Sequence, residues 1–216
     1  PDLGTPNLPI GRVSPMKMEL IVATKNKKKL KEIKLILRGL SLKIGALDDC
    51  GNKIRIVENG RTFREKAVKK AVKVAALKGK LTLGEDSGVC VNALNGAPGI
   101  YSSRFSGKNK SDTQNNLKLL KLLKGVPQNK RKAHYACAVA LADKRGLLGV
   151  VEGKCFGRID FTEKGFNGFG YDPLFLIPKY NKTFGQLSEE IKHKMSHRYR
   201  ALKKARSIIE KYIVKQ

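Results

Sequence analysis

The sequence predicts a mixed α/β fold, and three observations indicate it. Apolar strand-like runs alternate along the chain with segments of helical periodicity. Two of the helical segments begin at Ser/Thr capping boxes and end at glycines. A long apolar run is followed by a hairpin turn and a second run, so some neighbouring strands are antiparallel. This alternation favours helices packed on a sheet that is partly parallel and partly antiparallel.

Length and composition favour one domain without a membrane segment. The chain has 216 residues, of which 41% are hydrophobic, and its mean hydropathy is -0.35. No apolar run approaches the roughly 20 residues of a membrane helix. The N-terminal residues lack the apolar core of a signal peptide, so a cytoplasmic location and no membrane partner are expected.

The four cysteines, Cys50, Cys90, Cys137 and Cys155, form no C-x-x-C pair and no metal-ligand spacing. We expect reduced, packed thiols and no structural zinc.

The formal net charge of +27 suits nucleic acid, anionic surfaces or phosphorylated substrates. The lysines, however, are spread over nearly every predicted helix and loop. Aromatic residues make up 6% of the chain and are not interleaved with the lysines, as a base-stacking platform would require. Solvated helix faces can account for the dispersed lysines, so the charge alone assigns no function, and nucleic acid is not the expected partner.

The first ordered elements surround a lysine-rich turn. Residues 1–17 carry four prolines and two glycines without periodicity, which predicts a disordered extension, or a translated leader ahead of a start at Met16 or Met18. A single domain then covers residues 18–216. It begins with a strand over 19–23 and a helix over 26–38, whose apolar residues recur at helical spacing.

The turn between this strand and helix consists of Thr24, Lys25, Asn26, Lys27, Lys28 and Lys29. A strand-to-helix turn directs free backbone N–H groups and the positive end of the helix to one place, which favours a phosphate. The turn lacks the glycines of a P-loop. The residues alone leave a phosphate site and a solvated first turn as equal alternatives.

Short strands are predicted near 42–44 and 54–57, and a capping box at Thr62 opens a helix that ends at Gly79. The central stretch follows. An apolar run over 81–83 is predicted to break at Gly84 into the turn 85–88, Glu-Asp-Ser-Gly, before a second run over 89–94. Carboxylates at a strand end beside a turn suit Mg²⁺, although a solvated turn is the simpler interpretation.

The second half of the chain continues the alternation of elements. Ser111 caps a Leu-rich helix that ends at Gly125, and Ser196 caps a closing helix. The predicted strands and turns are a strand over 133–142, a hairpin turn at 143–146, a strand over 147–156, a glycine-aromatic loop over 165–173, a strand over 174–177 and a helical turn from Ser188.

Several separated motifs occur together in a fixed order. They are Ala23–Asn26 with Lys29, Glu58–Phe63 with Ala67 and Lys70-Ala71, Glu85–Gly88, Gly96–Gly107, Asn116-Leu117 with Leu120, Phe169–Pro173, and Ser196–Arg198. In these motifs the sequence resembles the inosine triphosphate pyrophosphatase family, which hydrolyses non-canonical purine nucleoside triphosphates to a monophosphate and pyrophosphate. The resemblance spans residues 19 to about 202.

The resemblance implies an elongated, twisted mixed sheet flanked by helices, with two lobes and a nucleotide groove between them. It implies a Mg²⁺-dependent enzyme and a homodimer that acts on dITP, ITP and XTP and so cleanses the nucleotide pool. It assigns Asp86 as catalytic base and metal ligand, with Glu58 and Glu85 as further candidate ligands. The chemistry of a carboxylate suits this role for Asp86, because it can hold a cation and orient the attacking water.

The resemblance also assigns the substrate contacts. Residues 24–29 match the triphosphate-binding turn, although Lys25 stands where many members have glycine, and Ser87 can donate to a phosphate oxygen. Lys66 stands where asparagine is usual. The base-recognition elements are Phe169, Gly170, Tyr171, Asp172, Lys192, His197 and Arg198.

These elements suit a purine with a 6-carbonyl. Phe169 can stack on the ring, while Lys192 and Arg198 can donate to the carbonyl. An adenine amino group would leave the donors unpaired, at about 1–3 kcal/mol per group. This contrast does not explain the rejection of GTP, which also has a 6-carbonyl.

Two alternatives stay open. One is a basic nucleic-acid-binding protein on the same fold, suggested by the charge. The other is a Maf-like nucleotide pyrophosphatase, against which the Phe-Gly-Tyr-Asp and Ser-His-Arg strings argue.

Overall fold

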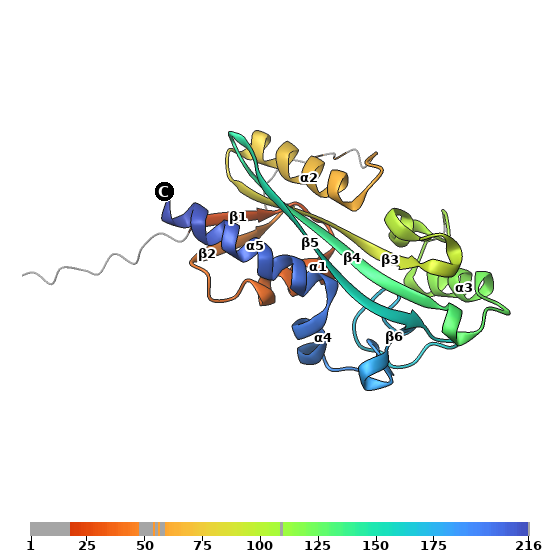
Figure 1. Cartoon of the computed structure of the whole chain (residues 1–216). Coiled ribbons are helices and arrows are strands. Elements are labelled where there is room, and N and C mark those ends of the chain that lie inside the picture. The colour runs from red at the N-terminus through yellow and green to blue at the C-terminus, as the bar shows by residue number, and fades with distance from the viewer. Residues whose placement is uncertain (1–17, 48–53, 55, 57–58, 109, 216) are drawn as a thin grey trace, which may run out of the picture.

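The computed structural model describes residues 18–47, 54, 56, 59–108 and 110–215. These residues contain a seven-stranded sheet in the order β2-β1-β3-β4-β5-β6-β7. Strand β1 is parallel to β2 and β3, and the remaining pairs are antiparallel, so the prediction of a mixed sheet is confirmed (Figure 1). The strands are β1 (Met18–Val22), β2 (Leu42–Ala46), β3 (Leu81–Val91), β4 (Lys132–Asp143), β5 (Gly146–Ile159), β6 (Phe175–Ile177) and β7 (Lys182–Thr183).

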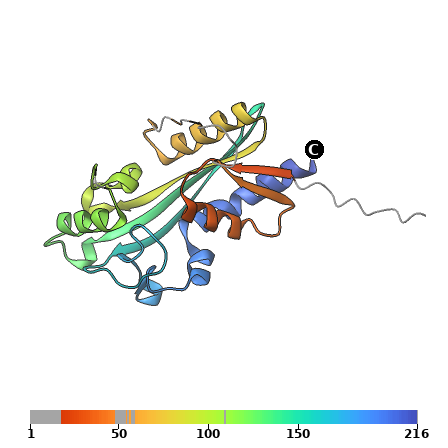
Figure 2. The same ribbon diagram turned by 180° about the vertical axis from the view of Figure 1, so that it is seen from behind.

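Helices cover both faces of the sheet where β1, β3 and β4 run together (Figures 1 and 2). Helix α2 (Phe63–Lys78) packs its alanines against Ala138, Ala140 and Ala142 of β4. The alternate residues of β4 face α1 (Lys27–Ile36) and α5 (His197–Val214) on the other side. Side chains on a strand point alternately to the two faces, which gives β4 two apolar faces.

The helix starts follow the predicted caps. The side chains of Asn26, Thr62, Ser111, Ser188 and Ser196 each accept a hydrogen bond from the backbone N–H three residues on. The last three begin α3 (Asp112–Leu122), α4 (Glu189–Met195) and α5. Short polar side chains satisfy otherwise unpaired N–H groups at these positions, which is why the starts were readable from sequence.

The predicted break of the central strand at Gly84 is wrong. Strand β3 runs without interruption from Leu81 to Val91, and residues Thr82–Val91 all pair with β4. The glycines serve close packing instead of a turn. A Cβ on Gly84 would lie 2.1 Å from the carbonyl oxygen of Ala67 in α2, and one on Gly88 would lie 2.4 Å from the carbonyl oxygen of Gly99.

Replacing Gly84 by alanine should therefore lower stability by about 2–3 kcal/mol, because the new methyl group would overlap the backbone of α2. The free energy of unfolding from urea titration measures the loss. Gly39→Ala is the control, since Gly39 has open space around it and only a positive φ of 87°. A loss at Gly84 no greater than at Gly39 would show that the close approach is not the constraint.

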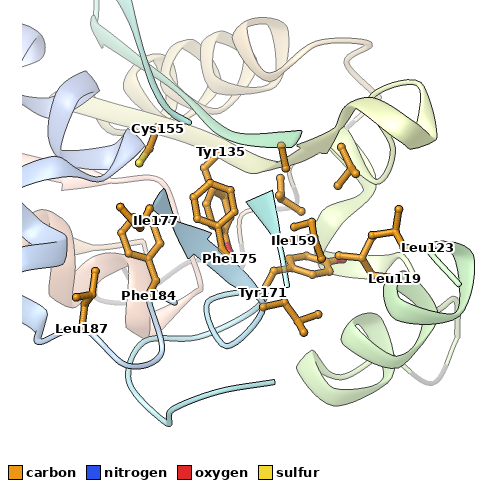
Figure 3. Close-up of a cluster of buried hydrophobic side chains, with 14 residues drawn as sticks. Leu119, Leu123, Tyr135, Cys155, Ile159, Tyr171, Phe175, Ile177, Phe184 and Leu187 are labelled. Carbon is orange, nitrogen blue, oxygen red and sulfur yellow. The ribbon is translucent and has the colours of Figure 1, made fainter. Parts of the chain in front are cut away.

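At the far end of the sheet, β6, α3 and the loops beside them pack on β3, β4 and β5 (Figure 3). Tyr135 of β4 lies among Cys155, Phe175 and Phe184 there. The structure thus has one apolar cluster between the sheet and α2, another between the sheet and α1 and α5, and a third at this end. Residues 1–17, Cys50 and most of the predicted strand over 54–57 lie outside the described residues; Ile54 and Ile56 are described and are not in a strand.

Within the described part of the chain, Cys90, Cys137 and Cys155 are free thiols, as expected. None of the helices described there is long and apolar enough to cross a membrane.

Candidate functional site

A cavity lies along the edge of β3 beyond the end of β1. Strand β1 pairs with β3 only at Leu81–Leu83, so the next residues of β3 have no strand on that side. Ligands of α/β proteins commonly bind where parallel strands end. The cavity has an empty volume of about 750 Å³, including its part open to solvent.

Most of the predicted site residues line this cavity. Its walls include Asn26, Lys29, Asp86, Ser87, Phe169, Gly170, Tyr171, Asp172, Lys192, His197 and Arg198. These residues come from five separate segments of the chain. The walls also include Tyr135 and residues of the segment 100–115 that were not predicted as site residues.

Of the predicted residues that the structure describes, five lie outside the cavity walls: Thr24, Lys25, Lys27, Lys28 and Glu85. Lys25, Lys27 and Lys28 are exposed, while the Thr24 hydroxyl accepts a hydrogen bond from the Asn26 N–H at 3.1 Å. The helix start therefore brings in Asn26 and Lys29 from the turn and leaves its other lysines in solvent. Glu58 lies outside the described residues.

The adjacent carboxylates Glu85 and Asp86 point to opposite faces of β3. The Oδ1 atom of Asp86 accepts a hydrogen bond at 2.9 Å from Lys70 of α2. The side chain of Glu85 is fully buried on the face of α1 and α5, where it accepts from Lys29 at 2.8 Å and from Arg198 at 3.1 Å. Both cations thus hold Glu85 in place behind the cavity.

The two carboxylates consequently titrate differently. Burial raises the pKa of Asp86, with Glu85 adding to the rise and Lys70 and Lys29 opposing it. Burial also acts to raise the pKa of Glu85, but the charges of Lys29 and Arg198 outweigh it and hold that pKa well below its ordinary value. Asp86 is the carboxylate suited to accept a proton, and Glu85 is the one that stays ionised.

Lys70 was missed as a site residue, although its motif was recognised. It lies on the face of α2 that carries Ala67 and Ala71, and it is 8% exposed. Lys66, one turn earlier, is 1% exposed and donates to the carbonyl of Ile100 at 2.9 Å. The sequence could have predicted both residues, because a lysine on the apolar face of a helix is expected to be buried and a buried lysine needs a partner.

Alternating charges surround Lys192, which is part of the cavity wall. Lys192 donates to Asp172 at 2.7 Å and to Glu32 of α1 at 2.9 Å. Glu32 also pairs with Arg198, which donates to the hydroxyl of Ser87 at 3.0 Å. Glu32 was not predicted as a site residue either. Its position in α1 next to the buried Ile33 could have indicated a buried carboxylate.

The ring of Phe169 lies among cations, with Lys192 Nζ 4.9 Å and the Arg198 guanidinium carbon 5.7 Å from its centroid. The imidazole of His197 stacks on the ring of Tyr135. Burial, followed by the charge of Arg198, holds the pKa of His197 well below its ordinary value, so the imidazole is neutral. His197 Nδ1 and Arg198 Nε are buried and have no hydrogen-bond partner among the described residues.

This arrangement indicates the class of protein to which the chain belongs. A mixed α/β protein whose cavity wall combines a carboxylate, lysines and an aromatic ring among hydrogen-bond donors is suited to bind a nucleotide. Residues 20–208 match the Ham1 family over most of the chain, and the protein belongs to that family. The resemblance identified in the sequence is confirmed.

Relatives agree with this assignment. The chain is 45% identical over 199 residues to the dITP/XTP pyrophosphatase of Desulforamulus reducens, covering 92% of this chain and 99% of the relative. It is 45% identical over 186 residues to the dITP/XTP pyrophosphatase of Rhodopirellula baltica, covering 86% and 89%. The solved structure of a HAM1 protein from Coxiella burnetii superposes with a TM-score of 0.82 at 34% identity, covering 90% and 99%.

Proposed function

We propose that the protein hydrolyses dITP, ITP and XTP to the nucleoside monophosphate and pyrophosphate, and so clears deaminated purines from the nucleotide pool. The observation that carries the proposal is that one cavity is lined both by Asn26, Lys29 and Asp86, which suit phosphates and a cation, and by Phe169 and Arg198, which suit a purine base. We call the first group the phosphate end and the second the base end. The names of the two relatives support the same reaction.

At the base end, the purine would stack on Phe169 and direct its 6-carbonyl toward Lys192 and Arg198. Both side chains are donors only. Burial acts to lower the pKa of Lys192, but Asp172 and Glu32 outweigh it and raise that pKa, so the amine stays charged. An adenine amino group would meet a donor there and leave two buried groups unpaired.

At the phosphate end, the first turn of α1 offers backbone N–H groups, with Asn26 as the cap and Lys29 beside the cavity. A helix N-terminus favours phosphate through its dipole and its free donors. We assign the triphosphate to this turn, with Ser87 as a further donor.

The residues present fit a magnesium ion. Mg²⁺ takes oxygen ligands and is commonly held by one or two carboxylates together with substrate phosphates and water. Asp86 provides one carboxylate at the cavity wall, and we propose Glu58 as a second. Glu85 is the weaker candidate, because it would have to give up its bonds to Lys29 and Arg198. Among the described residues, no group of three or more acidic, histidine or cysteine side chains could hold a metal.

When bound, Mg²⁺ would neutralise negative charge on the phosphate oxygens. The carboxylate of Asp86 would orient a water molecule and accept its proton. The water oxygen would then bond to the α-phosphorus while the bond from that phosphorus to the α–β bridging oxygen breaks, and pyrophosphate leaves with that oxygen. Lys70, which donates to Asp86 Oδ1, would fix the direction of the carboxylate.

A pyrophosphate-release assay with ITP, XTP, GTP and ATP tests this function. We expect kcat/KM for ITP and XTP to exceed that for ATP by about 100-fold or more, because two mismatched buried donors cost several kcal/mol. Chelation of Mg²⁺ should abolish turnover, and added Mg²⁺ should restore it. Similar rates on ITP and ATP would contradict the proposal, as would salt-dependent DNA binding without any turnover.

The homodimer and the cytoplasmic location stay predictions. Light scattering of the purified protein measures the first, and a mass of one chain would contradict it.

A further inference from the structure

We propose that Tyr135 is a positioning residue for base discrimination, because one side chain of β4 fixes both segments that form the base end of the cavity. Its hydroxyl holds the segment from Phe169 to Asp172, and its ring holds His197 at the start of α5. This inference rests on the proposed function for its substrate and extends it to a residue that was predicted only as part of a strand.

Tyr135 occupies a fixed position. It is 6% exposed, and its ring packs against Phe175 at a centroid distance of 4.6 Å and against Phe184 at 6.2 Å (Figure 3). Its strand is paired on both sides, with Val89 of β3 and Cys155 of β5 opposite it. A ring enclosed by strands and other rings has little freedom to move, so groups that it contacts are held to the frame of the sheet.

The hydroxyl of Tyr135 acts on Asp172. It donates to Asp172 Oδ1 at 3.3 Å, while Oδ2 of the same carboxylate accepts from Lys192 Nζ at 2.7 Å and from the backbone N–H of Phe169 at 2.8 Å. Burial and the nearby Asp172 charge hold the pKa of Tyr135 well above its ordinary value, so the hydroxyl keeps its proton. The orientation of one carboxylate thus determines where a base donor and the stacking residue lie.

The ring of Tyr135 acts on His197. The two rings stack with centroids 4.5 Å apart and planes 8° from parallel. On the other side of the helix start, a Cβ on Gly153 would lie 2.3 Å from the carbonyl oxygen of His197, so β5 approaches the backbone of α5 directly. The imidazole is held between these contacts with Nδ1 unpartnered among the described residues, and Arg198 follows it in the chain.

The phosphate end is supported by other residues. Asp86 is held by Lys70 of α2, and Lys29 pairs with Glu85, whereas the hydrogen bond and ring contacts of Tyr135 go to Asp172, Phe175, Phe184 and His197. A change confined to Tyr135 should therefore alter how the base is bound more than how fast the bound substrate reacts. A residue with only a stabilising role would lower activity on all nucleotides alike.

Tyr135→Phe tests the hydroxyl. It should raise KM for ITP about three- to tenfold, the effect of one net hydrogen bond, with kcat within twofold, and it should lower the preference for ITP over ATP. Tyr212→Phe is the matched control, since its hydroxyl also bonds to an aspartate, Asp143, at the hairpin of β4 and β5. Unchanged KM and preference in Tyr135→Phe, or the same change in the control, would overturn the proposal.

Tyr135→Leu tests the ring through a signal that does not need turnover. The stacked ring should shift the imidazole proton resonances of His197 upfield, and the chain has three histidines, so His197→Gln assigns them. We expect Tyr135→Phe to keep the upfield shift and Tyr135→Leu to lose it. Resonances unchanged in Tyr135→Leu would show that the stack does not exist.

Calorimetric binding of IMP and AMP separates this inference from the proposed function. If the wild type does not hydrolyse ITP, the function fails, whereas a preference for IMP that falls in Tyr135→Phe still supports the positioning role. Equal preference for IMP in both proteins would contradict that role even if the wild type is an active pyrophosphatase. Melting temperatures show whether each variant is folded.

Discussion

Asp86→Asn should lower kcat for pyrophosphate release from ITP by about 10³-fold or more. The substitution keeps the size of the side chain and removes the proton acceptor and the anionic oxygen ligand together. General-base catalysis alone commonly contributes about 10²- to 10⁴-fold, and loss of a metal ligand adds to it. Steady-state assays at saturating Mg²⁺ measure the effect. Glu189→Gln, an acid of an exposed ion pair with Lys31, is the control and should keep full activity.

This loss should not reflect unfolding. Burial raises the pKa of Asp86 in the folded protein above its ordinary value, so the ionised carboxylate costs stability at neutral pH. The amide of asparagine avoids that cost and can still accept from Lys70. We expect the free energy of unfolding at pH 7 to stay within about 1 kcal/mol of wild type. A variant with near-normal turnover would remove Asp86 from the mechanism.

The elements of the fold could be predicted because their signals are local. Ser196 and Thr62 begin helices through hydrogen bonds to residues three positions away, and Gly79 ends one in the left-handed conformation. Gly84 misled the prediction because its role is not local. Its missing Cβ accommodates Ala67 of a helix, and a glycine that admits another backbone has the same sequence pattern as one that makes a turn.

The residues of the candidate site also fall into those that local sequence motifs predicted and those that only the fold brings together. Asp86 and Arg198 stand in motifs and were predicted, whereas Glu32 and Tyr135 act through residues far away in the chain. The register of β3 with β4 places Tyr135 in the cavity wall, and the packing of α1 on α5 brings Glu32 to Arg198. The alternation of side chains along β3 then separates Glu85 from Asp86, a distinction that required knowing that both lie within one strand.

Arg198→Met should lower the free energy of unfolding at pH 7 by about 3–5 kcal/mol. The guanidinium is 2% exposed and pairs with both Glu32 and Glu85. Replacing it by an apolar side chain of similar length leaves two buried carboxylates with fewer cations, and breaking a buried pair from one side is strongly destabilising. Urea titration measures the loss.

The effect of Arg198→Met should depend on pH in a direction set by Glu85. Burial opposes ionisation, but Lys29 and Arg198 hold the folded pKa of Glu85 well below 4.5, its ordinary value. Such a group contributes stability that is fully present above the unfolded pKa and is lost as pH falls through the folded pKa. The variant lacks part of this contribution, and protonation removes the cost of carboxylates that have each lost one cation. The deficit should therefore be larger at pH 7 than at pH 4, by about 1 kcal/mol or more.

Arg206→Met is the matched control for this prediction. Arg206 pairs with Glu210 on the exposed side of α5, and such pairs contribute about 0.5 kcal/mol or less. If Arg198→Met costs no more than this control, or costs the same at pH 4 and pH 7, the buried pairs do not stabilise the fold in the way proposed. A large deficit confined to neutral pH would instead show that the residue expected to read the base also keeps Glu85 and Glu32 ionised and in place.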